Sequence, residues 1–476
     1  MQKYSFIFKK YLFWWVIGLF IFIPLYPKFP FINVPGTYVA IRLEDILIAV
    51  TFVWWVLSIG NEFKDLFKKT ITQTFLLFWG VTLLSLFSGI FLTQTVVPHL
   101  GLLHYLRRVE VMVLFFIAAS AITSFKQIKI WLLTMLVVTI LAVLYGFGQQ
   151  YLSFPVISTT NREFSKGLIL TLTPDARVNS TFAGHYDFAA YLAVTLTILS
   201  SVLLFYKRIV IRLLIALTSL FSLIILSLTA ARISFAACVI GITSVFIISG
   251  HKKLILLLAG LVLFAFIVSP DLRHRTVATI TVNILGGGGP KYILTPEQLE
   301  AERATSSAEQ KFSAEQFSSQ SATLSSVPRD ISPGEPVNST ELGVYRSFGI
   351  RLNEEWPRAI RAFLKNPFLG TGYSSLTIAT DNDYLRALGE TGILGFLALF
   401  LILLFILKHF WLFIKKKSKD KGLDFYLLVG IFGSALTILI NATFIDILES
   451  SKIAQLFWLT LGLGYGITNL REGTKP

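Results

Sequence analysis

The chain has 476 residues, of which 54% are hydrophobic and 14% are charged, and its mean hydropathy is +0.70. Soluble globular domains carry about 25% charged residues, so this composition excludes an ordinary soluble protein and predicts an all-α polytopic membrane protein. The single cysteine, Cys238, excludes a disulfide framework. The formal net charge of +15 raises the question of a nucleic-acid partner.

Apolar segments of spanning length recur along the chain. A helix needs about 20 mostly apolar residues to cross a bilayer, and this rule predicts about twelve spans. They lie near residues 11–26, 39–59, 71–93, 109–123, 128–148, 186–206, 209–228, 232–249, 253–269, 391–413, 423–445 and 453–469. The first segment lacks a small-residue cleavage site, which favours a helix over a signal peptide.

Basic residues are concentrated in one set of short loops. The groups are Lys64, Lys68 and Lys69; Lys207, Arg208 and Arg212; Lys252 and Lys253; and Lys415–Lys417. Because basic short loops remain cytoplasmic, we expect both termini in the cytoplasm. The positive charge then serves orientation and contact with anionic membrane lipids, so no nucleic-acid partner is expected.

This topology predicts three regions. An N-terminal membrane bundle, 1–269, precedes an extracytoplasmic loop, 270–390, and a C-terminal bundle, 391–476, follows it. The middle of the loop, 286–340, begins with a glycine run and is rich in Ser and Glu, so we expect a flexible insert. Within the insert, Pro296–Gln316 favours a polar helix.

The end of the loop has a helical pattern. Apolar residues recur at helical spacing from Trp356 to Leu364, with Asn353 as a suitable cap. We expect an amphipathic helix that lies on the bundle or in the membrane interface. Gly370 and Gly372 follow in a turn, which either is a plain turn or presents backbone N–H groups to a phosphate.

Arginines near the predicted outer surface are candidates for anion binding. Arg232 stands at the end of a span, where it either extends to lipid headgroups or binds an anion, because guanidinium stays charged and pairs with phosphate through two hydrogen bonds. Arg346 and Arg351, ahead of the loop helix, present the choice between a solvated surface and an anion contact. Arg177, at the mouth of span six, adds to this set.

Carboxylates and other polar groups lie close to these arginines in the sequence. Asp381 either caps the helix that enters span ten, a role Thr380 shares, or acts as a general base for a sugar hydroxyl. The residues expected to extend this binding surface are Asn382, Asp383, Tyr384, Arg386, His185 and Asp187. No His and Cys residues have metal-ligand spacing, so no metal or cofactor is expected.

Three segments resemble the O-antigen ligase and O-antigen polymerase superfamily of bacterial membrane proteins. The first two are Thr181-Phe-Ala-Gly-His-Tyr-Asp and Leu228-Thr-Ala-Ala-Arg. The third combines Arg351 and Trp356 with Asn366-Pro-Phe-Leu-Gly-Thr-Gly, Asp381-Asn-Asp-Tyr-Leu and Glu390-Thr-Gly-Ile-Leu-Gly. The family commonly has His-Asn in place of Asp381-Asn382, and the interval from Arg351 to Trp356 is one residue longer here. Arg346 therefore remains an alternative loop arginine.

The resemblance implies metal-independent glycosyl transfer at the outer face of the cytoplasmic membrane. The donor would be a glycan on undecaprenyl diphosphate, and the acceptor lipid A–core, a second lipid-linked glycan or a protein. Arg232 and Arg351 would bind the diphosphate, and Asp381, or otherwise His185, would take the acceptor proton. Ligase and polymerase remain alternatives. A transporter of the same lipid-linked glycan and a membrane scaffold are the competing classes.

Overall fold

The computed structural model describes residues 2–33, 40–60, 63–157, 169–172, 177–284, 348–376, 379–449 and 451–472. The insert 286–340, with the helix expected in it, and Arg346 lie outside the described residues. The helices of the first half are α1 (Gln2–Leu25), α2 (Leu43–Ile59), α3 (Phe63–Lys68), α4 (Thr70–Phe87), η2 (Ser88–Leu92), α5 (Pro98–Ala121), α6 (Phe125–Tyr151), α7 (His185–Phe205) and α8 (Ile209–Leu228). The remaining helices are α9 (Arg232–Ile248), α10 (Leu254–Val268), α11 (Pro270–Ala278), η4 (Thr279–Ile284), η6 (Arg351–Glu355), α14 (Trp356–Lys365), α15 (Asp383–Lys417), α16 (Leu423–Asn441) and α17 (Ser451–Glu472).

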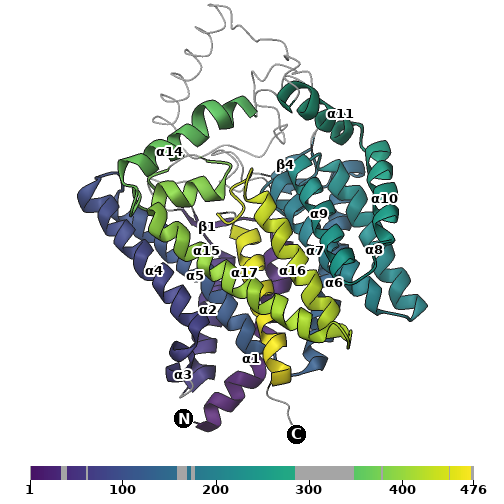
Figure 1. The fold of residues 1–476 in the computed structure, drawn as a ribbon, viewed down its shortest axis with the longest axis horizontal. Helices are drawn as coiled ribbons and strands as arrows, with labels where there is room; N and C mark the ends of the chain where they lie inside the picture. The colour runs from purple at the N-terminus through teal and green to yellow at the C-terminus, as the bar shows by residue number, and fades with distance from the viewer. Residues whose placement is uncertain are drawn as a thin grey trace, which may run out of the picture.

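The long helices form an upright bundle. The start of α1 and the end of α17 lie at one end of it, and α11 and α14 lie at the opposite end (Figure 1). By length and composition, seven of the described helices can cross a membrane, or eight if α10 and α11, which meet at a bend of 103°, form one span. The chain is therefore a helical multi-pass membrane protein.

Each of the twelve expected spans falls on a helix, although the structure supports fewer spans by composition. Helices α2 and α9 have 17 residues each. Helix α5 carries Arg107, Arg108 and Glu110 near its middle. The number twelve therefore remains a prediction, and seven or eight of the described helices are long and apolar enough to cross a membrane.

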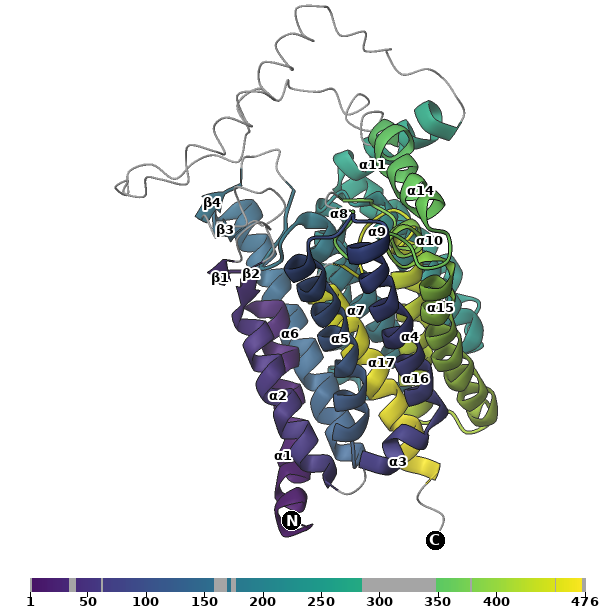
Figure 2. The ribbon, with the colours of Figure 1, turned by 90° about the vertical axis from the view of Figure 1, so that its left-hand side faces the viewer.

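Two small sheets were not expected. Strand β1 (Pro30–Asn33) pairs with β2 (Ala40–Arg42), and β3 (Pro155–Ile157) pairs with β4 (Ile169–Thr171), both antiparallel. Both sheets lie at the same end of the bundle as α11 and α14 (Figure 2). Strands this short have no room for the alternation of apolar and polar residues that identifies a strand in sequence.

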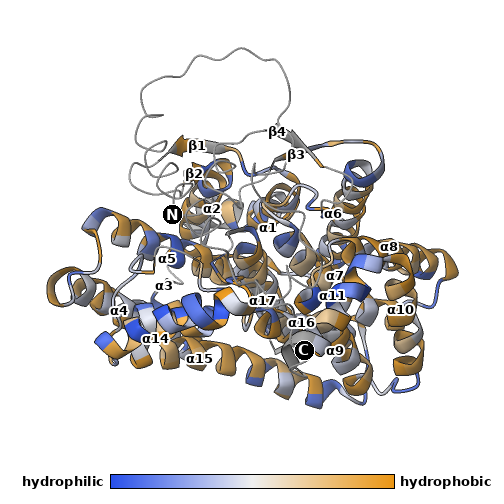
Figure 3. Ribbon diagram, turned by 90° about the horizontal axis from the view of Figure 1, so that it is seen from above, coloured by the Kyte–Doolittle hydropathy of each residue, from blue (hydrophilic) through white to orange (hydrophobic). Residues whose placement is uncertain are grey.

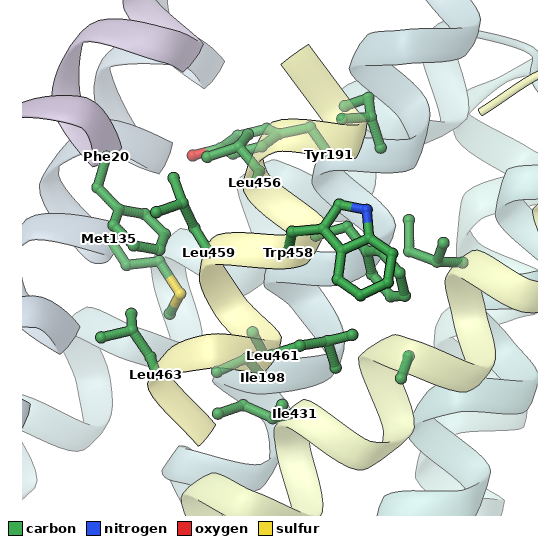
Figure 4. Packing of buried hydrophobic residues seen from close by; sticks show 14 of the residues in the cluster. Phe20, Met135, Tyr191, Ile198, Ile431, Leu456, Trp458, Leu459, Leu461 and Leu463 are labelled. Atoms are coloured by element: carbon green, nitrogen blue, oxygen red, sulfur yellow. The ribbon is translucent and has the colours of Figure 1, made fainter. Parts of the chain in front are cut away.

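Helix α17 lies at the centre of the core. Its Leu459 points toward Phe20 of α1 and Met135 of α6 (Figure 4), while Trp458, on another side of the helix, packs against Phe75 of α4 with ring centroids 5.4 Å apart, and all five side chains are buried. Aliphatic and aromatic side chains from distant parts of the chain therefore meet around one helix, which fixes the bundle from within.

Close backbone contact joins α17 to α5. A Cβ atom on Gly462 would lie 2.2 Å from the Phe115 carbonyl oxygen, and one on Gly466 would lie 2.8 Å from that of Ala119. Small residues four positions apart allow two helices to approach closely, which is a common basis for helix association in membranes.

We expect Gly462→Ala to destabilise the folded protein by about 1–3 kcal/mol, because the added methyl group forces α5 and α17 apart. The measurement is the thermal unfolding midpoint of the detergent-solubilised protein. Gly80→Ala is the matched control, because a Cβ atom there meets nothing within 4 Å. Equal midpoints for the two variants would contradict the close approach.

Helix α14 lies across the end of the bundle. It forms a hydrophilic stretch above mainly hydrophobic helices, as does α11 (Figure 3). Ala359 is buried, whereas Ile360 and Leu364 are 44% and 65% exposed. The expected cap at Asn353 is wrong, because the chain is already helical from residue 348 and Asn353 lies within the π-helical turn η6. A π-helical turn accommodates an extra residue, and this turn separates Arg351 from Trp356.

A break in α15 receives the glycine turn. Gly392 interrupts the helix with φ 63° and ψ −173°, and the amides of Ile393 and Thr371 donate to the carbonyls of Pro367 (2.8 Å) and Gly389 (3.0 Å). A Cβ atom on Gly370 would lie 2.5 Å from the Glu390 backbone. The turn thus packs backbone to backbone against α15.

Candidate functional site

Four arginines from separate parts of the chain gather at the end of the bundle that carries α11 and α14. Arg177 precedes α7, Arg232 begins α9, Arg275 lies in α11 and Arg351 begins η6. Arg177 and Arg351 lie near enough to Arg232 for their positive charges to repel its charge, and Arg177 and Arg232 repel the charge of Arg275 in the same way. We call these four residues the arginine cluster. Such a cluster of positive charge attracts an anion.

Arg232 links the start of α9 to α11 and η4. Its Nη1 atom donates to the Thr279 hydroxyl and, at 3.3 Å, to the Arg275 carbonyl oxygen. The turn before α9 aims it there, since Ala230 adopts a left-handed conformation with φ 49°. The interaction with three further arginines favours the anion-binding interpretation of Arg232 over headgroup contact alone.

His185 is engaged by the same cluster. The Nη1 atom of Arg177 lies 2.6 Å from its Nε2 atom. Guanidinium is only a donor, so Nε2 is the acceptor and its lone pair is occupied. The His185 ring also lies against Tyr186, with ring centroids 4.0 Å apart. This arrangement supports a positioning role for His185 and disfavours the alternative in which it takes the acceptor proton.

Asp381 forms an ion pair with Arg351. The Arg351 Nη2 atom donates to the Asp381 Oδ2 atom at 2.5 Å, and the Arg351 residue is 9% exposed. Burial raises the pKa of Asp381, while the Arg351 charge lowers it and Asp446 raises it further. Asp381 has φ 48°, a conformation that Asp tolerates better than most residues. It therefore does not cap α15, and that expectation is wrong.

Glu355 is a second carboxylate beside this ion pair. Burial raises its pKa to about 7; the negative charges of Asp381 and Asp446 act in the same direction, and those of Arg351 and Arg358 oppose them. Its Oε2 atom is buried and has no hydrogen-bond partner among the residues described. No function was predicted for Glu355 from its sequence pattern.

Asp446 braces the start of α15. Its carboxylate accepts hydrogen bonds from the amides of Thr380 (2.7 Å) and Asn382 (3.1 Å) and from Arg386 Nη1 (3.0 Å). Asn382 is the helix cap, since its side chain accepts from the Leu385 amide. Arg386 is 8% exposed and donates also to the Leu376 carbonyl. These contacts give Arg386 a structural role, and its substrate contact stays a prediction.

Asp383 completes this brace. It is 5% exposed, and its Oδ2 atom accepts from the amides of Ile447 and Leu448, both at 2.9 Å. The Tyr384 hydroxyl donates to the Leu439 carbonyl at 2.7 Å. These contacts tie α15 to the connection between α16 and α17. Asp383 is buried and Tyr384 is partly buried, and the substrate contact of each stays a prediction.

The glycine turn also differs from its predicted role. The Gly370 amide donates to the Asn366 carbonyl and the Gly372 amide to the Glu390 carbonyl, both at 2.8 Å. These N–H groups are therefore used within the fold and are not presented to a phosphate. The plain-turn alternative is the one that the hydrogen bonds favour.

Asp187 belongs to a different group of charges. Its Oδ2 atom lies 3.8 Å from the Nζ atom of Lys28. Nearby Lys452 is 1% exposed and donates to the carbonyls of Pro24, Tyr26 and Thr181. This second group fastens the segment before α7 to α1 and α17, so Asp187 is not brought to the arginine cluster.

The structure therefore brings together only part of the predicted set. Arg177, His185, Arg232, Arg351 and Asp381 are connected through the contacts above. The residues that the sequence analysis missed are Arg275, Glu355 and Asp446. Asp446 follows directly on a predicted span, and an ionisable residue in that position is a signal of function or of a buried partner.

The whole sequence was compared with known proteins. No model of a known protein family matches the chain, and a search of curated proteins finds no similar sequence. The functional interpretation therefore depends on the geometry of the site and on the resemblance of the three segments.

Proposed function

We propose that the chain is an O-antigen ligase-like glycosyltransferase of the bacterial cytoplasmic membrane. It moves a glycan from undecaprenyl diphosphate to an acceptor hydroxyl at the outer face, with both termini in the cytoplasm and the arginine cluster outside. The observation that carries the proposal is the convergence of four arginines, one of which, Arg351, lies beside the carboxylates Asp381 and Glu355.

The arginine cluster suits a diphosphate leaving group. Cleavage of the bond between the sugar and the phosphate places negative charge on the diphosphate. Fixed guanidinium groups at a partly buried site stabilise that charge without reorganisation during the reaction. Arg232 and Arg351 are the proposed clamp, and Arg177 and Arg275 add to the same positive field.

The carboxylates suit the acceptor. A hydroxyl becomes a good nucleophile when a positioned base takes its proton. Asp381 is the base that the resemblance implies, and it lies 2.5 Å from Arg351 of the proposed clamp. Glu355 is a second carboxylate near Asp381 and Arg351.

A polymerase of the same superfamily is the second candidate. It uses the same donor and differs only in taking another lipid-linked glycan as acceptor, which the arginine cluster serves equally well. A transporter of lipid-linked glycan would bind its cargo with polar groups near mid-membrane on broken helices. The cluster instead lies at one end of the bundle (Figure 1), which favours chemistry at the membrane surface.

A strain that lacks this gene tests the function. We expect the length distribution of glycan on undecaprenyl diphosphate and on the acceptor to change. Long chains left on the lipid with a bare acceptor identify a ligase, and single repeat units on the acceptor identify a polymerase. Unchanged glycan on both carriers would contradict glycosyl transfer.

Removal of divalent metal gives a further prediction. Because arginines neutralise the diphosphate in this proposal, we expect the purified protein to keep its transfer rate in EDTA. The donor is the lipid-linked glycan extracted from the deletion strain, and the rate is followed as released undecaprenyl diphosphate. Loss of transfer in EDTA with recovery in Mg²⁺ would show that the arginines are insufficient.

A further inference from the structure

We infer that Glu355 accepts the proton of the acceptor hydroxyl, and that Asp381 instead positions Arg351 on the diphosphate. This inference rests on the proposed glycosyl transfer and deepens it. Its basis is the placement of two carboxylates beside one arginine, of which one forms an ion pair with that arginine and the other has a buried oxygen without a hydrogen-bond partner among the described residues.

Asp381 is poorly suited to take a proton. Its Oδ2 atom is held by Arg351 Nη2 at 2.5 Å, and protonation would discard that charge-assisted hydrogen bond, one of the stronger interactions available to a carboxylate. The same bond fixes the guanidinium in place. Asp381 therefore acts through Arg351 as a positioning residue.

The neighbouring carboxylates serve the fold. Asp446 accepts three hydrogen bonds, from two backbone amides and Arg386. Asp383 accepts two from backbone amides. The Asp383 Oδ1 atom and the Glu355 Oε2 atom are both buried without a hydrogen-bond partner in the described parts of the chain. Glu355 differs in its position, because it lies within the electrostatic reach of Arg351 and Asp381. A buried acceptor without a hydrogen-bond partner destabilises the fold, and a substrate hydroxyl placed there would remove that penalty.

The charges facing Glu355 suit a base that works near neutral pH. Burial raises the pKa of Glu355 most. The negative charges of Asp381 and Asp446 raise it further, the positive charges of Arg351 and Arg358 lower it, and the resulting pKa is about 7. The best general base has a pKa close to the operating pH. The geometry that supplies the empty oxygen thus supplies suitable basicity as well.

The step balances in atoms and charge. The acceptor oxygen forms a bond to the anomeric carbon while the bond from that carbon to the phosphate oxygen breaks. The bonding electron pair leaves with undecaprenyl diphosphate, beside Arg351 and Arg232. The hydroxyl proton passes to Glu355 Oε2, and Glu355 afterwards releases it to water.

The test is the pH dependence of transfer by the purified protein. The donor and acceptor are the lipid-linked glycan and the acceptor fraction extracted from the deletion strain. A base is active when deprotonated, so the wild-type rate should fall as the pH drops below about 7 and level off above it. Glu355→Gln should lower the rate at high pH by about 10²–10⁴-fold and abolish this dependence.

Three variants make the result specific. Glu355→Asp keeps a carboxylate and should retain partial activity with a pH-dependent rate. Asp381→Asn should lower the rate but keep the dependence, because Glu355 still titrates. Glu354→Gln, one residue earlier on an exposed side chain, should behave as the wild type. Binding of undecaprenyl diphosphate to Glu355→Gln, measured by titration, shows that the variant is folded.

The outcomes separate this inference from the proposed function. If the wild type transfers no glycan, the proposed function fails. If the wild type is active and Glu355→Gln keeps its rate and pH dependence, Glu355 is not the base. If Asp381→Asn removes the pH dependence instead, the proton acceptor is Asp381 and the inference is overturned.

Discussion

Replacement of Arg351 by Ala should lower glycan transfer by about 10²–10³-fold, the usual effect of removing one donor that stabilises charge in a transition state. Arg351 contributes one of the guanidinium groups of the arginine cluster and holds Asp381 at 2.5 Å. Arg232→Ala should have a similar effect, because it removes a second charge and releases α11 from α9. The measurement is the rate of undecaprenyl diphosphate release.

Matched substitutions separate site chemistry from surface charge. Arg273→Ala removes a positive charge from the exposed side of α11, two residues from Arg275, and Arg361→Ala does the same on α14. Both should transfer glycan at the wild-type rate. Arg351→Lys should transfer glycan at an intermediate rate, since lysine keeps the positive charge but cannot form the paired hydrogen bonds that a guanidinium makes to a phosphate. Equal losses in Arg273→Ala and Arg351→Ala would reduce the cluster to a general electrostatic effect.

Replacement of Gly392 by Ala should destabilise the protein and abolish transfer. Gly392 has φ 63° and ψ −173°, a region that is essentially restricted to glycine, and a residue forced into it pays about 1–3 kcal/mol. A Cβ atom there would also lie 2.3 Å from the Phe368 carbonyl oxygen. The glycine turn and the start of α15 would move apart and displace Asp381.

The measurements for Gly392→Ala are the thermal unfolding midpoint in detergent and the transfer rate. Gly349→Ala is the control, because residue 349 lies in the helical stretch before Arg351. A Cβ atom there meets only the side-chain amide nitrogen of Asn353, at 3.8 Å. A wild-type midpoint for Gly392→Ala would show that the break in α15 does not require glycine.

Hydropathy located the long helices of the bundle. Each segment of spanning length coincides with a helix, because burial in a bilayer demands a long apolar run that is visible in sequence. The boundaries were less accurate. Helix α5 begins at Pro98, well before the predicted 109, since its polar first half carries Arg107 and Arg108 and was not counted as membrane-spanning.

The candidate site was only partly visible in sequence. The arginines stood out because a charge near a span is costly and needs a partner or a function. The partnerships of those charges depend on the tertiary fold, because Asp446 meets Arg386 across 60 positions of sequence. Glu355 resembled any acidic residue in the first turn of a helix, and its partial burial next to Asp381 has no signature in the sequence.

The glycine-rich segment illustrates a motif whose role changed. Gly370 and Gly372 have the composition of an anion-binding turn, yet their amides donate to backbone carbonyls. What requires glycine is the close backbone approach to α15, and a close approach between residues 370 and 390 cannot be read from either residue alone. The physical basis of the motif is packing that positions Asp381 and Arg351.

The most direct test of the account reconstitutes the purified protein in lipid vesicles with lipid-linked glycan and acceptor fraction from the deletion strain. Mass spectrometry then measures undecaprenyl diphosphate freed of its glycan. The account predicts release by the wild type and little release by a variant that combines Arg232→Ala with Arg351→Ala. No release by folded wild-type protein, or equal release by both proteins, would contradict glycosyl transfer at the arginine cluster.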